Sequence, residues 1–366
     1  SGEVVVNVCI VTITELENFG NKLQNFALQE ELKELGVQVD TAPNLINYEY
    51  RRKKSFVIKQ IIAGVLHKNL RWRIAVLKKK HEFSKFDSRY LTFSQFASTL
   101  SHIPSDLDEY YDLFIAGSDQ IWNPYFTFNF DFNFLTFAKQ DKRIAYAASF
   151  GVEKIPDKMR SAFRTYLNGL KCISVREYAG QNIVKELTGN QCKVLLDPTL
   201  LRTSEQWLQM ERKPRWIKGN ERFVLLYCLG DDTLKSEPLK RILLSQQYSD
   251  CKMVDINDMN DWRKYTIAPD HFIWLIHHAQ LIITDSFHAT VFSILFEKSF
   301  FYAQRKDENT SMSSRVSSLK SLLDFPFPDN EIIHPTQQDI ARVQMALKRR
   351  KKEAIQYLKD ALEIHE

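Results

Sequence analysis

The stretch that decides the fold is Leu281-Ile282-Ile283-Thr284-Asp285-Ser286-Phe287-His288-Ala289-Thr290-Val291-Phe292-Ser293. Its first part is an apolar run of strand length, and its second part places apolar residues such as Phe287 and Val291 at helical spacing. Ser286 stands between the two parts, where its hydroxyl can accept the free amide of Ala289 and cap the helix. The stretch therefore predicts a strand that turns directly into a helix.

His288 falls in the first turn of that predicted helix. Unpaired backbone amides and the helix dipole favour an anion there, and the carboxyl end of a strand is where an α/β sheet places chemistry. The alternative is a structural histidine that caps the turn or packs within it. The residues of this stretch leave both interpretations open.

The length and composition restrict the class of protein. With 366 residues, the chain is long enough for two domains or one large α/β unit, and its 44% hydrophobic and 26% charged residues are typical of a soluble globular protein. No apolar run approaches the ~18 residues that span a bilayer, and no secretion signal is predicted. The five cysteines are scattered without C-x-x-C spacing, which favours buried thiols and predicts no metal site. We therefore expect a cytoplasmic protein.

A basic segment covers residues 51–80, which contain eleven Lys and Arg and no Asp or Glu. Because the net charge of the chain is +5, the rest of the protein is net negative. Apolar residues such as Ile61 and Trp72 interleave the charges, a pattern that suits peripheral contact with an anionic membrane or a lipid-linked substrate. The alternative is a solvated helical face that is merely cationic. No recognised binding motif accompanies the charge, so we expect no nucleic-acid partner.

Strand-like and helical stretches alternate along the chain in two halves. This alternation predicts an α/β protein with two Rossmann-like, doubly wound parallel sheets that face each other across a cleft. We place the first domain at residues 1–170, with a basic helical insertion at 51–85, and the second at 171–335. Residues 336–366 are predicted to form one long helix that packs back on the first domain.

Polar and small residues follow several predicted strands, at the edge of the sheet where ligands bind in such folds. Small residues let the backbone approach a ligand, and polar side chains can hold it. The turn near residue 20 lacks a G-x-G-x-x-G pattern, so no dinucleotide fingerprint is present. The candidates at strand ends are Asn18, Gly20, Asn21, Gly117, Ser118, Asp119, Trp122, Asn123, Ser149, Arg176 and Asp197.

Two of these positions have clear structural alternatives. Arg176 ends a predicted strand, and its planar guanidinium suits a carboxylate or a phosphate, but it could equally form a salt bridge with Glu177 or another neighbour. The loop after Gly117 could be a tight polar turn in which Trp122 packs.

Six short motifs occur in order along the chain. They are Asn18-Phe19-Gly20-Asn21 with Gln24, Gly117-Ser118-Asp119-Gln120-Ile121-Trp122-Asn123, Ala145-Tyr146-Ala147-Ala148-Ser149-Phe150-Gly151, Ser174-Val175-Arg176-Glu177, Leu196-Asp197-Pro198-Thr199-Leu200-Leu201 and Thr284-Asp285-Ser286-Phe287-His288. Each is weak alone, but their order and spacing resemble the polysaccharide pyruvyl transferase family over most of residues 5–325.

The resemblance implies a GT-B-like fold and the transfer of pyruvate from phosphoenolpyruvate onto a sugar as a ketal. It implies phosphoenolpyruvate as the donor, no required cofactor, and a sugar or lipid-linked oligosaccharide of a bacterial surface polymer as the acceptor. Some members of the family carry Arg-Leu-His where this chain has Ser286-Phe287-His288. The histidine carries over and the arginine does not; we expect Arg315 to compensate.

Ketal formation needs an acid–base group that works near neutrality, and His288 is the best-placed histidine for it. Asp119 is the candidate that orients or deprotonates an acceptor hydroxyl. The donor's carboxylate and phosphate are assigned to Arg176 and Arg315, together with the helix start at Ser286 and Phe287. The other candidates at strand ends are assigned to the acceptor or to the cleft.

Two alternatives stay open. A GT-B glycosyltransferase that uses a nucleotide sugar would share the architecture and the anion-binding helix. A non-catalytic member of a polysaccharide assembly complex would share the fold without the chemistry. Binding of phosphoenolpyruvate rather than nucleotides separates the first alternative from pyruvyl transfer.

Overall fold

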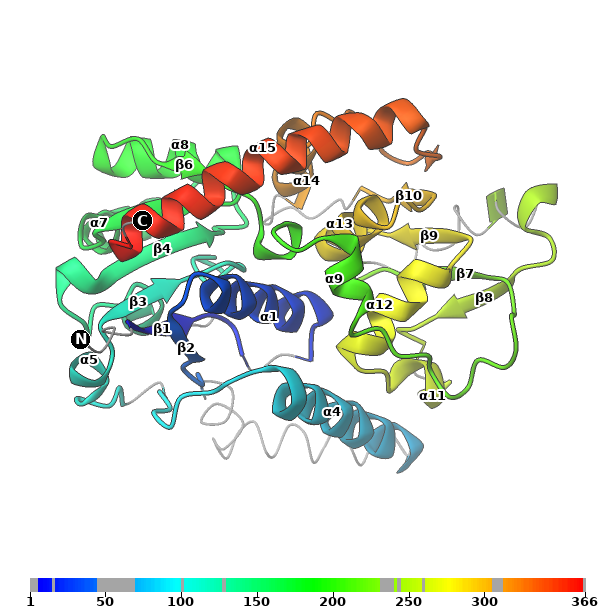
Figure 1. Cartoon of the computed structure of the whole chain (residues 1–366), viewed down its shortest axis with the longest axis horizontal. Helices are drawn as coiled ribbons and strands as arrows, with labels where there is room; N and C mark the ends of the chain where they lie inside the picture. The colour runs from blue at the N-terminus through cyan, green and yellow to red at the C-terminus, as the bar shows by residue number, and fades with distance from the viewer. Residues whose placement is uncertain are drawn as a thin grey trace.

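Two parallel sheets lie side by side, each with helices packed on it, and one long helix runs along both (Figure 1). The computed structural model describes residues 6–14, 17–44, 70–99, 102–126, 130–230, 240–241, 245–258, 261–304 and 312–364. Residues 51–69 of the basic segment lie outside the described residues. None of the described helices is long and apolar enough to cross a membrane.

The first sheet has six parallel strands in the order β2-β1-β3-β4-β5-β6. Its core strands are runs of β-branched and small apolar residues, which favour strands buried on both faces. The strands are β1 (Asn7–Val11), β2 (Gln38–Thr41), β3 (Leu113–Ala116), β4 (Arg143–Ala148), β5 (Cys172–Val175) and β6 (Lys193–Val194). The accompanying helices are α1 (Phe19–Glu34), α4 (Leu70–Tyr90), α5 (Leu107–Tyr110), α6 (Phe130–Asn133), α7 (Asp157–Asn168) and α8 (Tyr178–Thr188).

The second sheet has five strands in the order β11-β10-β9-β7-β8, of which only the edge strand β11 runs antiparallel, to β10. The strands are β7 (Phe223–Tyr227), β8 (Lys252–Asp255), β9 (Leu281–Thr284), β10 (Phe300–Tyr302) and β11 (Ile332–Ile333). The helices of this half are α9 (Ser204–Leu208), α11 (Trp262–Tyr265), α12 (Pro269–His278), α13 (Phe287–Leu295), α14 (Met312–Leu322) and α15 (Gln337–Leu362). The prediction of two facing Rossmann-like units with a terminal helix is confirmed.

The boundary predicted at residue 170 is wrong. Strands β5 and β6 pair with β4 and with each other, so they extend the first sheet to residue 194. The second sheet begins with β7, at residue 223. Because pairing between parallel strands is non-local, the alternation of strands and helices along the sequence does not reveal which sheet a strand joins.

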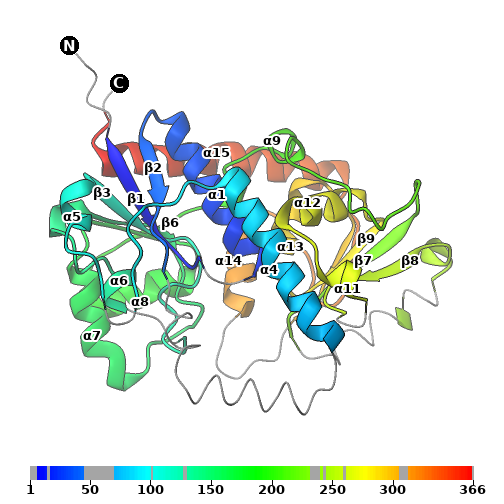
Figure 2. The same ribbon diagram turned by 90° about the horizontal axis from the view of Figure 1, so that it is seen from below.

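Two helices cross between the domains on opposite sides of the molecule (Figures 1 and 2). Helix α4 follows the first strands of the chain but packs on α11 and α12 of the second domain. Arg89 of α4 lies 3.8 Å from Asp270, and Glu82 lies 3.8 Å from Arg212. Helix α15 crosses the other way, and its Tyr357 hydroxyl donates a 2.8 Å hydrogen bond to the carbonyl of Ala145 in β4.

One lysine of the basic segment lies inside the protein rather than on its surface. Lys79 is 8% exposed, and its ammonium group lies 4.3 Å from the centre of the Tyr265 ring and 5.4 Å from that of Phe19. Burial lowers the pKa of Lys79 to about 8, although Glu17 opposes the change. Among the described residues of the basic segment, Lys79 therefore does not add its charge to a solvated face.

We expect Leu358→Ala in α15 to lower the free energy of unfolding by about 2–5 kcal/mol, because the side chain is fully buried where the helix packs on the first domain. Met345→Ala in the same helix is the matched control, since Met345 is 75% exposed and should change stability by less than about 0.5 kcal/mol. Urea unfolding measures both. Equal losses in the two variants would contradict this packing.

Candidate functional site

The turn from β9 into α13 forms as the sequence predicts. Ser286 is the N-cap of α13, and its hydroxyl accepts the amide of Ala289 at 3.5 Å. The hydroxyl of Thr284 donates to the carbonyl of Tyr227 at 2.6 Å and accepts the amide of Ser286 at 2.9 Å. These bonds anchor the turn to β7, so the first turn of α13 starts at a defined place beside the sheet.

Asp285 has a structural role in the same turn. Its carboxylate accepts the amides of Leu229 and Gly230, each at 2.7 Å. These residues follow β7, so the carboxylate joins the ends of two neighbouring strands. Charge-assisted hydrogen bonds of this kind are among the stronger ones in proteins.

His288 lies where the two domains meet. Its ring packs directly on Gly20, so close that a Cβ at position 20 would overlap the imidazole. Gly20 belongs to the first turn of α1, whose N-cap Asn18 accepts the amide of Asn21 at 3.2 Å. The N-termini of α1 and α13, both favourable to negative charge, therefore converge on this histidine.

A buried ion pair lies on the other side of His288. The Arg176 guanidinium, at the end of β5, bonds one carboxylate oxygen of Asp197 at 2.7 Å. The same oxygen lies 3.4 Å from Nε2 of His288 and accepts the hydroxyl of Ser118 at 3.1 Å. Thr199 donates its amide and its hydroxyl to the second oxygen of Asp197. Asp197 is thus the centre of the cluster.

The charges in this cluster shift the pKa values of both partners. Burial by itself raises the pKa of Asp197, but His288, Arg176 and the hydrogen bond from Thr199 outweigh it and hold the pKa well below its ordinary range. Burial disfavours the charge of Arg176, yet Asp197, Asp119 and Glu177 keep the pKa of the guanidinium above its ordinary value. Both groups are therefore charged throughout the neutral range.

Several buried polar atoms of the cluster make no hydrogen bond within the described part of the chain. They are Nε and Nη2 of Arg176, Oε2 of Glu177 and Nε2 of His288. Such atoms are rare in folded proteins, and when they gather at one place they mark a site that a ligand or water can satisfy. Nη2 of Arg176 lies 3.5 Å from a carboxylate oxygen of Asp119, and Nε lies 4.0 Å from Oε2 of Glu177, so both groups form ion pairs without a hydrogen bond.

Other predicted residues support the cluster from the first domain. Gly117 has a φ of +141°, and a Cβ there would meet the carbonyl of Tyr146. The amide of Ser118 bonds the side chain of Gln24 at 3.1 Å. Ser149 donates its hydroxyl to Glu177 at 3.0 Å. These contacts hold the ends of β3 and β4 beside Asp197.

The two arginines expected to bind the donor lie in different surroundings. Arg176 forms the salt bridge that was its structural alternative, and its guanidinium also lies 4.6 Å from the centre of the Phe287 ring. Arg315 lies in α14 and is 4% exposed. When the Gln120 amide is turned so that its oxygen faces Arg315, that oxygen accepts hydrogen bonds from the guanidinium group.

Trp122 and Asn123 have structural roles. Trp122 stacks on Phe134 at 4.7 Å and donates its indole N–H to the carbonyl of Asn133. The side-chain oxygen of Asn123 accepts the amide of Tyr125 and stabilises its own loop. Trp122 therefore packs inside the loop after Gly117, as the structural alternative for this loop predicts.

Sequence reasoning did not assign three residues that the cluster depends on. Glu177 is fully buried and accepts the amide of Phe150 at 2.9 Å, Gln24 holds Ser118, and Thr199 holds Asp197. All three lie inside the motifs that carry the family resemblance. Their place in those motifs was the signal that could have identified them.

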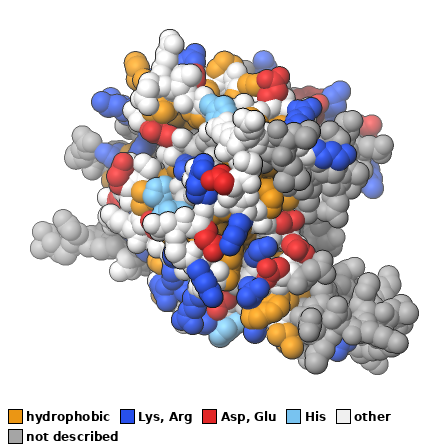
Figure 3. Space-filling view, turned by 90° about the vertical axis from the view of Figure 1, so that its right-hand side faces the viewer, with side chains coloured by type: hydrophobic (Ala, Val, Ile, Leu, Met, Phe, Trp, Pro, Cys, Tyr) orange, Lys and Arg blue, Asp and Glu red, His pale blue; other side chains and the backbone are white. Residues whose placement is uncertain are grey.

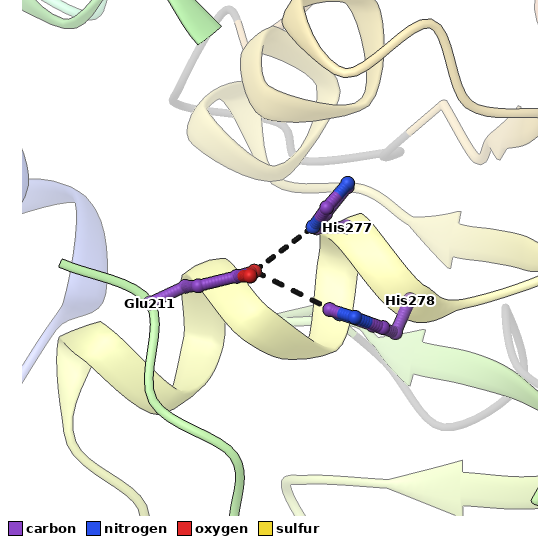
Figure 4. Close-up of side chains that lie close together, drawn as sticks. All are labelled: Glu211, His277 and His278. Atoms are coloured by element: carbon purple, nitrogen blue, oxygen red, sulfur yellow. Dashed lines mark hydrogen bonds and ion pairs between the residues drawn. The ribbon is translucent and has the colours of Figure 1, made fainter. Parts of the chain in front are cut away.

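A second polar group lies at the end of α12, where we predicted no metal site. His277 and His278 both face Glu211 (Figure 4), with Nδ1 to carboxylate distances of 2.9 and 3.7 Å. Each of these three side chains offers one atom that could bind a metal ion, and these atoms lie within 4.8 Å of one another. Nδ1 of His278 also lies 3.0 Å from the carbonyl of Trp274, so that nitrogen is already engaged by its own helix. The group joins α12 to the segment after α9.

We expect Asp197→Asn to lower the free energy of unfolding by about 3–5 kcal/mol, because it leaves the buried guanidinium of Arg176 without its closest counter-charge. Asp119→Asn, which removes a carboxylate 3.5 Å from the same arginine, should cost less. Urea unfolding at neutral pH measures both variants, and equal losses would contradict the central place of Asp197. Because the folded pKa of Asp197 lies below its ordinary 3.8, its stabilisation is fully present above that pH and is lost as the pH falls further.

Gly20→Ala should destabilise the protein by about 1–3 kcal/mol, because the new methyl group overlaps the imidazole of His288. In a His288→Ala background the same substitution should be neutral or slightly stabilising, since the ring is gone and alanine favours a helix. Thermal unfolding of the four proteins measures this coupling. If Gly20→Ala costs the same in both backgrounds, the close contact between the two residues is wrong.

The comparisons with known proteins concern the family and the fold. Residues 18–303 match the model of a family described as polysaccharide pyruvyl transferase. No curated protein matches the chain. The structure is similar to UDP-GlcNAc 2-epimerase from Neisseria meningitidis bound to UDP-GlcNAc, with a TM-score of 0.52, 10% identity, and coverage of 99% of this chain and 100% of that chain. It is also similar to a putative UDP-N-acetylglucosamine 2-epimerase from Listeria monocytogenes, with a TM-score of 0.48, 11% identity, and coverage of 98% and 91%.

At such low identity, the structural likeness concerns the fold alone, which is GT-B. The family match covers most of the chain and contains all six motifs of the cluster. The protein therefore belongs to the polysaccharide pyruvyl transferase family, a family of transferases in polysaccharide biosynthesis.

Proposed function

We propose that this protein transfers pyruvate from phosphoenolpyruvate to two hydroxyl groups of a sugar in a bacterial surface polysaccharide, forming a ketal. The observation that carries the proposal is His288, held between the Asp197 carboxylate and Gly20 at the meeting point of two helix N-termini. Membership of the family supports the same reaction.

The surroundings of His288 suit an anionic donor. Helices α1 and α13 both direct their N-termini at it. Nε and Nη2 of Arg176 make no hydrogen bond to the described residues, although Glu177 and Asp119 lie 4.0 and 3.5 Å away, so they add two donors of a planar guanidinium. We assign the carboxylate or the phosphate of phosphoenolpyruvate to these groups. Arg315 is the second cation of this region, and we assign it to the donor charge that remains, in place of the arginine that some family members carry where this chain has Ser286.

The reaction needs one proton to be delivered and two to be removed. A protonated His288 gives its proton to the methylene carbon of the donor, which becomes a methyl group and leaves a cation-like centre at the neighbouring carbon. One sugar hydroxyl attacks that carbon, its proton returns to the histidine, and the carbon–oxygen bond to phosphate breaks. A second hydroxyl then closes the ketal, and its proton leaves with the phosphate.

Each member of the cluster has a defined part in these steps. The Asp197 carboxylate orients the imidazole and stabilises it while it carries the proton, as a carboxylate does beside a catalytic histidine. Asp119 lies beside Arg176, and we assign its carboxylate to the acceptor hydroxyl. We assign the acceptor, a sugar or lipid-linked oligosaccharide, to the first-domain side of the cluster, near Ser118 and the first turn of α1 at Asn21.

The test combines the protein, phosphoenolpyruvate and candidate repeat units of a surface polysaccharide. Mass spectrometry should show the sugar gaining one pyruvate less one water, and inorganic phosphate should appear in equal amount. His288→Ala should lower the rate by about 10²- to 10⁴-fold, the range that general acid–base groups contribute. His278→Ala, at the half-exposed end of α12, is the matched control and should retain full activity.

The donor distinguishes this proposal from its alternative. Calorimetry should detect binding of phosphoenolpyruvate that weakens in Arg176→Lys, because lysine cannot present a planar pair of donors. Binding of a nucleotide sugar without binding of phosphoenolpyruvate would replace the proposal by glycosyl transfer. Binding of the sugar with no turnover of either donor would replace it by a non-catalytic role in polymer assembly.

A further inference from the structure

Exposed apolar side chains gather where helix α4 meets helix α11. Ile74 and Leu77 of α4 are 43% and 66% exposed, and Trp262 of α11 is 40% exposed. The two helices pack on each other, and the ammonium group of Lys78 lies 3.9 Å from the centre of the Trp262 ring. We call this surface, formed by Arg73, Ile74, Leu77, Lys78 and Trp262, the α4–α11 face.

Ile74 and Leu77 do not belong to the side of α4 that packs on the protein. Helix α4 buries its other side through Ala75, Phe83 and Phe86, each at most 3% exposed. Ile74 and Leu77 are three residues apart and point away from that buried side. Several large apolar side chains on one exposed helical face indicate a contact surface, whereas single exposed apolar residues are common and need no explanation.

Positive charge surrounds the apolar side chains. Arg73 and Lys78 are exposed, and residues 70–81 of α4 contain no Asp or Glu. The one acidic residue at the start of α11, Asp261, lies 3.4 Å from both Arg263 and Lys264 and is compensated by them. The sequence immediately before α4 continues the same charge, since residues 51–80 contain eleven Lys and Arg and no acid.

Most of the face belongs to helix α4, which lies at the surface of the molecule. Helix α4 lies across both domains on the side of the molecule that Figure 2 turns toward the viewer. Hydrophobic and basic side chains lie next to each other at the lower edge of the face in Figure 3, the side of the molecule where α4 runs. Leucine, isoleucine and tryptophan beside lysine and arginine, on two helices that pack together, have the composition of a surface that enters the headgroup region of a bilayer.

We propose that the α4–α11 face docks the protein on a membrane surface rich in anionic lipids. Leu77, Ile74 and Trp262 enter the interface, while Arg73 and Lys78 contact the lipid headgroups. Arg73 and Lys78 of this face, in a stretch of the sequence that has eleven Lys and Arg and no acid, are complementary to an anionic bilayer and select this occupant over a neutral one. The proposal does not depend on which donor the cleft uses.

The test is sedimentation of the full chain with vesicles of phosphatidylcholine alone or mixed with phosphatidylglycerol. We expect binding to the mixed vesicles only, weakened when the salt is raised from about 0.1 M to about 0.5 M, because salt screens the headgroup charge. Leu77→Glu and Lys78→Glu should each weaken this binding about tenfold or more. The tryptophan emission should shift to the blue on binding, and Trp262→Phe should remove most of that shift.

Matched controls lie on α15. Met345→Glu places the same charge at a side chain that is 75% exposed, and Lys352→Glu reverses an exposed lysine; both should bind like the unchanged protein. The proposal is overturned if the protein does not bind the mixed vesicles, or if Leu77→Glu and Lys78→Glu bind no worse than the controls. It is also overturned if light scattering shows a dimer that Leu77→Glu dissociates, because the face then joins two copies of the chain.

Discussion

The salt bridge between Arg176 and Asp197 is the interaction on which the site depends. Two charges taken out of water are costly, and such a pair persists only when further hydrogen bonds satisfy it. Here Ser118 and Thr199 supply those bonds to Asp197, and His288 approaches from the second domain. The pair therefore sets the relative positions of the ends of β3 and β5 and of the first turn of α13. A buried ion pair adds little stability compared with apolar packing, but it tolerates few geometries, which suits a site that must be pre-organised.

An apolar contact next to the cluster holds the domains together. Phe19, in the first turn of α1, stacks on Phe272 of α12 at 4.5 Å and lies 5.5 Å from Tyr227 of β7. Its neighbour Gly20 has no side chain, which is why the His288 ring can lie against the backbone of α1. One pair of adjacent residues thus does two different things: the phenylalanine binds the second domain, and the glycine leaves room for its histidine. Helices α4 and α15 brace the same arrangement from opposite sides.

Local features of the fold could be predicted from the sequence, and long-range partners could not. The Ser286 cap, the strand before it and the terminal helix depend on neighbouring residues and on periodicity, and they form as expected. The assignment of β5 and β6 to the first sheet depends on pairing with β4, which no local pattern encodes. For the same reason the sequence left open whether Arg176 binds a ligand or a neighbour, and only the approach of residue 197 shows its partner. The sequence also could not show whether Trp122 packs or binds a ligand, because an aromatic residue at a strand end can do either. In the structure Trp122 packs on Phe134.

The balance of charge in the cluster determines how an anion can be held there. Asp119, Glu177 and Asp197 face Arg176, so the formal charges around this arginine do not by themselves favour a negative donor. The backbone adds to the guanidinium: the amides at the starts of α1 and α13 carry partial positive charge, and both helix starts lie against His288. The carboxylates then have a different effect, because they keep the guanidinium fixed and keep a counter-charge next to His288. In the proposed reaction, Arg176 and the helix termini hold the anion, and the Asp197 carboxylate keeps the imidazole of His288 in place at 3.4 Å, so the proton donor and the negative charge of the substrate lie side by side.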